Sequence, residues 1–123
     1  MSSSKPVKQE SEERILPRHH FEARIKIEIL RGRKKFETEG WARDLSESGV
    51  GAFVGADLDV GELATLRIPL GPGNELVIPA RITRNLGTEY GFQFTALSQT
   101  QRAQIRHVLG ASKAIPYSPV SAR

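Results

Sequence analysis

The segment FEARIKIEI, residues 21–29, carries the plainest structural signal in this chain. Every second residue of the segment is apolar, and each residue between them is charged. A period of two is typical of a β-strand with one face buried and the other in water. The segment therefore predicts a strand whose inner face is formed by Phe21, Ala23, Ile25, Ile27 and Ile29.

Similar alternation continues along the chain, interrupted by turns. Residues 31–34 form the first expected turn, and GPGN, residues 71–74, has the composition of another. Gly40 marks an expected bulge in the second strand. Further strands are expected at residues 35–43, 50–54, 63–70, 76–82 and 90–94. Six short strands at this spacing predict a mainly β fold, a small six-stranded antiparallel barrel.

The period changes after the last strand. Residues 98–101, SQTQ, have the form of a capping box, with Ser98 as the N-cap and Gln101 at the third helical position. Gly110 stands where a glycine would end the helix. The helical face is apolar at Ile105, Val108 and Leu109. The pattern predicts one C-terminal α-helix that covers an open end of the barrel.

Polar segments flank this region. Residues 1–13 hold few apolar side chains and residues 111–123 lack periodicity, so we expect a flexible leader and a flexible tail. The 123 residues then leave one domain, residues 14–110. No apolar run approaches the roughly 20 residues of a membrane span. The N-terminus also has no secretory signal, so a cytoplasmic protein without membrane insertion is expected.

The formal net charge is +4, from 18 Lys and Arg against 14 Asp and Glu. Up to Glu89 the two signs cancel, 14 against 14. The whole excess therefore lies in Arg102, Arg106, Lys113 and Arg123. A positive charge confined to one end of the chain argues against a nucleic-acid polymer as the partner.

Nothing in the sequence indicates catalysis. The absence of Cys excludes thiol catalysis, disulfides and thiolate metal sites. His19 and His20 are adjacent and would point to opposite faces of a strand, and His107 lies in the expected helix. No common hydrolase, metalloprotease or phosphate-loop motif occurs. We therefore expect a protein that is not an enzyme and has neither a metal site nor a cofactor.

Two short motifs do not fit a purely structural role. In the first, Arg14 and Arg18 stand four residues apart just before the first strand. The second is DLSESG, residues 44–49, between the second and third strands. Its aspartate and serine are small acceptors at a strand end, and its glycine permits a positive φ or a close backbone approach. Each motif alone is ordinary, but the two in this order around six strands are not.

On these motifs the chain resembles the PilZ domain, the bacterial receptor module for cyclic di-GMP. That family has an RxxxR segment leading into the first strand, a [D/N]xSxxG motif between the second and third strands, a six-stranded antiparallel barrel and a C-terminal helix. The last predicted strand, YGFQF, also resembles a strand typical of the family. The matching positions are Arg14 and Arg18 in the first motif, and Asp44, Ser46 and Gly49 in the second.

The resemblance implies that these residues bind cyclic di-GMP, and their chemistry suits it. An arginine fork can bond the O6 and N7 edge of guanine, stack on the ring or bridge phosphate oxygens. Asp44 and Ser46 can accept from the N1–H and amino group on the opposite edge. We expect binding to order Arg14 and Arg18 against the barrel. An effector protein in trans would read the changed surface, in the control of motility, biofilm or surface polysaccharide.

Three other residues were candidates for the site. Arg24 follows His20 by four, but it lies within the first strand, so Arg14 and Arg18 match the family motif better. Arg81 could assist with a phosphate, although a solvated strand arginine is its expected role. Trp41, the only Trp, could stack on a base, although a place on the barrel wall is its expected position.

Two alternatives remain open at this point. One is a small basic barrel that binds RNA or single-stranded DNA through its basic C-terminal region. Such barrels expose aromatic side chains for stacking, whereas the strand aromatics Phe21, Phe36, Phe92 and Phe94 fall on positions patterned for the core. The other is a PilZ protein that makes protein contacts without the ligand, against which the intact motifs argue.

Overall fold

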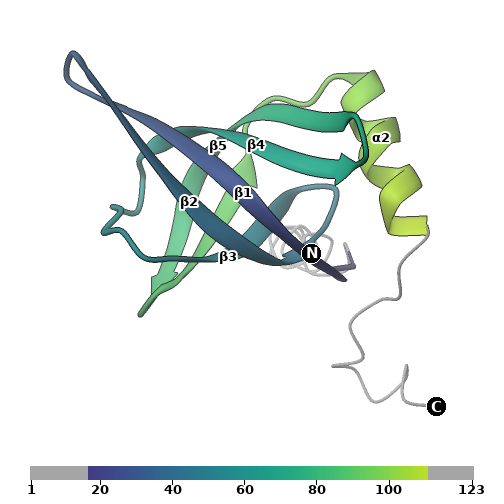
Figure 1. Ribbon diagram of the computed structural model, residues 1–123, viewed down its shortest axis with the longest axis horizontal. Helices are drawn as coiled ribbons and strands as arrows, with labels where there is room; N and C mark the ends of the chain where they lie inside the picture. The colour runs from purple at the N-terminus through teal and green to yellow at the C-terminus, as the bar shows by residue number, and fades with distance from the viewer. Residues whose placement is uncertain (1–16, 111–123) are drawn as a thin grey trace, which may run out of the picture.

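The computed structural model describes residues 17–110, and this region contains six strands and one helix. The strands are β1 (His19–Arg31), β2 (Lys34–Leu45), β3 (Gly49–Val54), β4 (Leu63–Gly71), β5 (Asn74–Leu86) and β6 (Glu89–Phe94), and the helix is α2 (Gln99–Gly110). The strands form a closed antiparallel barrel in the order β1-β2-β3-β6-β5-β4 (Figure 1). Pairing of β4 with β1 closes it. The predicted fold is therefore confirmed.

Alternate residues of each strand fill the barrel. The inward side chains Ile25, Ile27 and Ile29 are at most 1% exposed, while the charged residues between them face outward. The inward side chains of β4 and β5 are buried in the same core, formed by Ala64, Leu66, Ile68, Leu76, Ile78, Ala80 and Ile82. The core also takes up Phe92, with Phe21, Phe36 and Phe94 packed against it.

Gly40 does not mark a bulge, so that prediction was wrong. It pairs in register with Ile25 of β1 and Val54 of β3. A Cβ at Gly40 would lie 2.9 Å from the carbonyl oxygen of Phe53. The glycine therefore serves close packing of two strands, and the irregularity of β2 lies further along, between Ala42 and Asp44.

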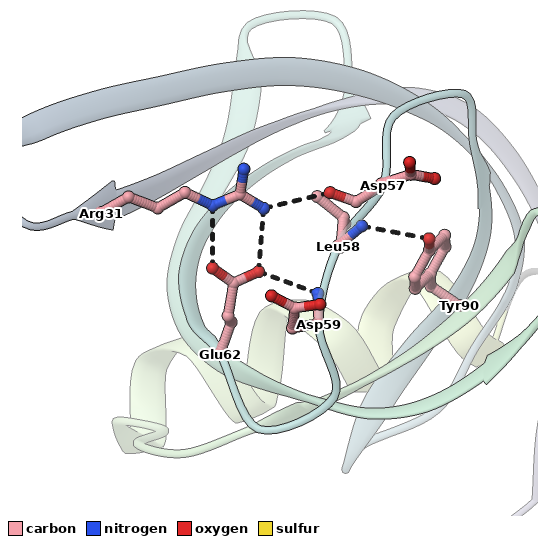
Figure 2. Close-up of polar contacts among 6 residues, drawn as sticks. All are labelled: Arg31, Asp57, Leu58, Asp59, Glu62 and Tyr90. Carbon is pink, nitrogen blue, oxygen red and sulfur yellow. Dashed lines mark hydrogen bonds and ion pairs between the residues drawn. The ribbon is translucent and has the colours of Figure 1, made fainter.

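A polar network ties the end of β1 to the loop between β3 and β4 (Figure 2). The Arg31 guanidinium donates to both carboxylate oxygens of Glu62, at 2.9 and 3.0 Å, and to the carbonyl oxygen of Asp57 at 3.1 Å. Glu62 also accepts from the backbone N–H of Asp59 at 2.9 Å. The hydrogen bonds from Arg31 hold the pKa of the Glu62 carboxyl below its ordinary value and raise the pKa of Arg31.

The same loop is fixed from the barrel side by Tyr90 of β6 (Figure 2). The Tyr90 hydroxyl accepts from the backbone N–H of Leu58 at 3.1 Å and donates to the carbonyl oxygen of Ala56 at 3.3 Å. Leu58 is itself part of the core. A long connection without regular structure is thus held on both sides.

Helix α2 begins as predicted. The backbone N–H of Gln101 donates to the Ser98 hydroxyl at 3.0 Å, and the backbone N–H of Ser98 donates to the Gln101 side chain at 3.1 Å. Ile105 and Leu109 are buried against the barrel, and the Gln101 amide donates to the carbonyl oxygen of Val77 at 2.8 Å. α2 therefore lies beside the β4–β5 hairpin (Figure 1). No helix within residues 17–110 is long and apolar enough to cross a membrane.

An acidic residue of the loop before β3 also holds α2. The Glu47 carboxylate pairs with Arg102 at 3.7 Å and with Arg106 at 3.2 Å. Both arginines belong to the acid-free C-terminal region that carries the excess positive charge. Part of that charge therefore has a partner inside the domain, which weakens the nucleic-acid alternative.

The Arg31–Glu62 pair predicts a pH-dependent contribution to stability. A carboxyl whose pKa is lower in the folded than in the unfolded chain stabilises the fold at pH values above its ordinary pKa, which is near 4.5 for Glu62. This stabilisation is lost as the pH falls through the pKa of the folded state. Glu62→Gln should lower the midpoint of thermal unfolding by a few degrees near neutral pH and have little effect in acid. The control Glu37→Gln breaks an exposed pair with Lys35 and should have little effect at either pH. A difference that grows in acid would contradict this assignment.

The contacts of Glu47 predict looser docking of α2 when its charge is removed. In Glu47→Gln, backbone amides of α2 should exchange with solvent faster, while those of β4 and β5 keep their protection. Added salt should reduce the difference, since ionic strength screens half-exposed pairs. Glu75→Gln, which breaks the pair with Arg67 on the barrel wall, is the matched control. Equal exchange of α2 amides in both variants would rule out a docking role for Glu47.

Candidate functional site

One extra residue in β2 brings an acidic side chain to the outer surface. Ala42 and Leu45 both point into the core, although an odd spacing separates them. Strict alternation requires an even spacing, so one residue between them is a bulge. The pairing with β3 slips between Ala42 and Asp44, which identifies Arg43 as the bulged residue. Asp44 therefore lies opposite Gly51, on the outer face of the barrel.

A second bulge does the same for a basic side chain on β5. The pairing of β5 with β6 slips between Ile82 and Arg84, so Arg84 lies opposite Gly91. A Cβ at Gly91 would stand 3.3 Å from the Arg84 Cβ and 3.4 Å from its Nε, so the arginine lies across the glycine. Because Gly91 pairs in turn with Gly51, a floor of two glycines separates Asp44 from Arg84.

Gly91 and Arg84 line a hollow of about 460 Å³ on the barrel wall. The lining includes two arginines and no carboxylate, which suits an anion. A larger hollow of about 540 Å³ elsewhere on the wall is lined by four glutamates with one lysine and one arginine, and would repel an anion. The lining of the first is formed by Arg18, Ser46, Ser48, Gly49, Thr83, Arg84, Gly91, Phe92 and Gln93.

Arg18 and Asp44 meet at the edge of the hollow. The Arg18 Nε lies 3.7 Å from a carboxylate oxygen of Asp44, and the two side chains are 45% and 12% exposed. This distance is an ion pair rather than a hydrogen bond. Within residues 17–110, Arg18 is the only cation paired with Asp44. A carboxylate has about four acceptor positions, so most of those on Asp44 are left for other donors.

The loop from Ser46 to Gly49 is a hydrogen-bonded turn. The Ser46 backbone N–H donates to the carbonyl oxygen of Gly49 at 2.9 Å, and the buried Ser46 hydroxyl accepts from the backbone N–H of Ser48 at 3.1 Å. A Cβ at Gly49 would collide with the carbonyl oxygen of Phe92 on β6. The predicted close approach is thus confirmed, while the alternative of a positive φ at Gly49 was wrong.

The structure brings most of the predicted site residues together. Arg18, Ser46 and Gly49 line the hollow and Asp44 borders it. Arg14 lies outside the described residues. Arg81 is not in the lining, although it pairs across the sheet with Gln93, which is.

Sequence reasoning missed Arg84, Gly51 and Gly91. The two glycines pair across β3 and β6, and the Asp44 carboxylate oxygens lie 2.9 and 3.1 Å from where a Cβ of Gly51 would be. Both glycines therefore make room for a charged side chain. The sequence carried one usable signal for this, the odd spacing of the apolar residues on either side of Arg43 and Asp44.

The arrangement favours binding by hydrogen bonds and charge. Arginine forks donate to phosphate oxygens or to the acceptor edge of a purine, and a carboxylate with a nearby hydroxyl accepts from its donor edge. Within residues 17–110, no group of three or more His, Asp or Glu side chains could hold a metal ion.

Comparison with known proteins agrees with this fold. A family model described as the PilZ domain matches residues 8–111. The PilZ domain of CeSA from a cellulose-synthesizing bacterium is 23% identical, with a TM-score of 0.60, over 76% of this chain and 94% of that one. The PilZ domain of YcgR from Escherichia coli, solved with c-di-GMP, is 15% identical, with a TM-score of 0.60, over 76% of this chain and 86% of that one.

A third structure, the inhibitor of motility MotI/DgrA of Bacillus subtilis, is 15% identical, with a TM-score of 0.59. The match covers 76% of this chain and 48% of that one, so this chain spans about half the length of the inhibitor. No curated protein is similar enough to count as a match. At these identities the solved structures establish a shared fold, and the family model covers most of the sequence. The chain therefore belongs to the PilZ domain family.

Proposed function

We propose that this protein is a cyclic di-GMP receptor without catalytic activity, and that the hollow beside Asp44 is its binding site. The observation that carries the proposal is the meeting of Arg18, Ser46 and Gly49 in one hollow bordered by Asp44. Membership of the PilZ family supports it, as does the solved complex of the YcgR PilZ domain with c-di-GMP.

The charges around the hollow match the ligand. Cyclic di-GMP carries two phosphates, and the lining offers Arg18 and Arg84 without an acid. Asp44 and Ser46 accept from the N1–H and amino group of one guanine. Since Arg18 and Asp44 share an ion pair at 3.7 Å, both keep their hydrogen-bonding capacity for a base or phosphate placed between them. Arg14 supplies the second arginine of the RxxxR motif.

The receptor signals through a change in the molecular surface around its binding site. Binding brings Arg14 and Arg18 over the nucleotide, and an effector protein in trans reads the altered face. The protein acts in the cytoplasm, where it regulates motility, biofilm formation or surface polysaccharide. No nucleic-acid polymer, metal or cofactor takes part in this scheme.

Calorimetric titration with cyclic di-GMP tests the site. Arg14→Ala and Arg18→Ala should each weaken binding at least roughly tenfold, since each removes charge-assisted hydrogen bonds. The control is Arg24→Ala, which removes an exposed arginine of strand β1. Arg24 stands four residues after His20, the same spacing as in the RxxxR motif, and this variant should bind normally. Circular dichroism should show an intact barrel in all three variants. Wild-type affinity in both Arg14→Ala and Arg18→Ala would refute the assignment.

Gly51→Ala offers a second test, aimed at the carboxylate. The new methyl group would occupy the space of the Asp44 carboxylate, a side-chain end that can move aside without unfolding the sheet. We expect a near-normal melting temperature and an affinity for cyclic di-GMP lowered roughly 10- to 100-fold. Gly55→Ala is the matched control, because no heavy atom lies within 4 Å of its new Cβ. Equal affinities of the two alanine variants would mean that the position of Asp44 does not matter.

A further inference from the structure

Two exposed aromatic side chains form a pair on the outer wall of the barrel. Trp41 of β2 and Phe53 of β3 lie directly opposite each other and are 43% and 37% exposed. Their neighbours Ala42 and Val54 point into the core, so both rings lie on the outer face of the barrel. The core of this barrel is complete without them.

The aromatic pair lies two residues along β3 from Gly51. Phe53 follows Gly51 on the same face of β3, which separates their Cα atoms by about 6.6 Å, two residues of strand rise. Gly51 and Gly91 have no side chains of their own, and the Asp44 carboxylate and the Arg84 side chain lie over them. Trp41 lies on the same strand and the same outer face as Asp44, as Phe53 does with Gly51, so a flat molecule that reaches Asp44 can extend along β2 and β3 to the rings.

The two rings are not equally accessible for stacking. The Arg43 guanidinium lies over the Phe53 ring, 5.1 Å from its centroid, and covers one of its faces. Arg43 is the bulged residue that also turns Asp44 outward. Trp41 has the larger ring system and the greater exposed fraction, so it offers the better surface for stacking.

We propose that Trp41, with Phe53 beside it, is the stacking site for the second guanine of cyclic di-GMP. The inference rests on the proposed function and adds a base-binding subsite to it. The ligand has two guanines, and Asp44 with Ser46 accepts from the polar edge of only one of them. The other base has a flat π face, which an exposed indole covers at little conformational cost.

This subsite contributes affinity and no base selectivity. Stacking on an aromatic ring tolerates every base, because each has a π face. Discrimination for guanine therefore stays with Asp44 and Ser46, which face hydrogen-bond donors. Removal of the ring should weaken binding without changing which bases are accepted.

Trp41 is the only tryptophan in the chain, so its fluorescence reports this subsite alone. Titration of the wild type with cyclic di-GMP should quench that fluorescence along the same curve as the calorimetric titration. Trp41→Leu should bind roughly 5- to 150-fold more weakly. Trp41→Phe, which keeps a ring, should recover most of the affinity. Leu86→Ala is the control, since it removes a 72% exposed apolar side chain on β5 that has no ring to stack.

The outcomes separate this inference from the function on which it rests. If wild type and Trp41→Leu bind equally, or if binding leaves the fluorescence unchanged, the stacking site is refuted and the proposed receptor function is retained. If the wild type does not bind cyclic di-GMP, both are refuted. Should Trp41→Leu fail to fold, the quenching of the wild type and the affinity of Trp41→Phe decide the matter.

Discussion

Each strand of this barrel must keep its apolar face inward, and the site exists because that alternation changes phase at two places. In β2 the extra residue Arg43 places Asp44 on the outer face and returns Leu45 to the core. If Arg43 continued the regular alternation instead of forming a bulge, Asp44 would point into an apolar interior, where an unpaired carboxylate is strongly unfavourable. In β5 the slip before Arg84 acts in the same way. The two bulges together oppose an acid and a base across one patch of wall.

Local charge placement matters more here than the net charge. The excess of +4 lies in the C-terminal region, yet Arg102 and Arg106 are engaged with Glu47. The arginines of the hollow belong instead to the part of the chain whose charges cancel. Glu47 also joins two parts of the molecule, because it belongs to the loop that carries Ser46 and holds α2. Loop and helix are therefore electrostatically connected in a way that overall composition does not reveal.

Features that depend on neighbouring residues could be predicted from the sequence. The alternation of residues 21–29 and the capping box at Ser98 are local patterns, and the structure confirms both. The role of Gly40 could not be predicted, because a strand glycine can mean either a bulge or a close approach and only the atoms across the sheet decide between them. The role of Arg84 depends on which residue of β6 lies opposite, which is a non-local property. The change of phase in β2 is visible in the odd spacing of Ala42 and Leu45, a signal separate from the strand glycine at Gly40.

The glycines of β3 and β6 have a mechanical consequence. Glycine weakens a strand interior through its large conformational freedom, and Gly49, Gly51 and Gly91 concentrate this weakness where these two strands join. Asp44 and Arg84 stand on the strands to either side of that seam, on β2 and β5. Any molecule held by both would span the β3–β6 pairing and would stiffen the barrel at the strand pair that these glycines weaken.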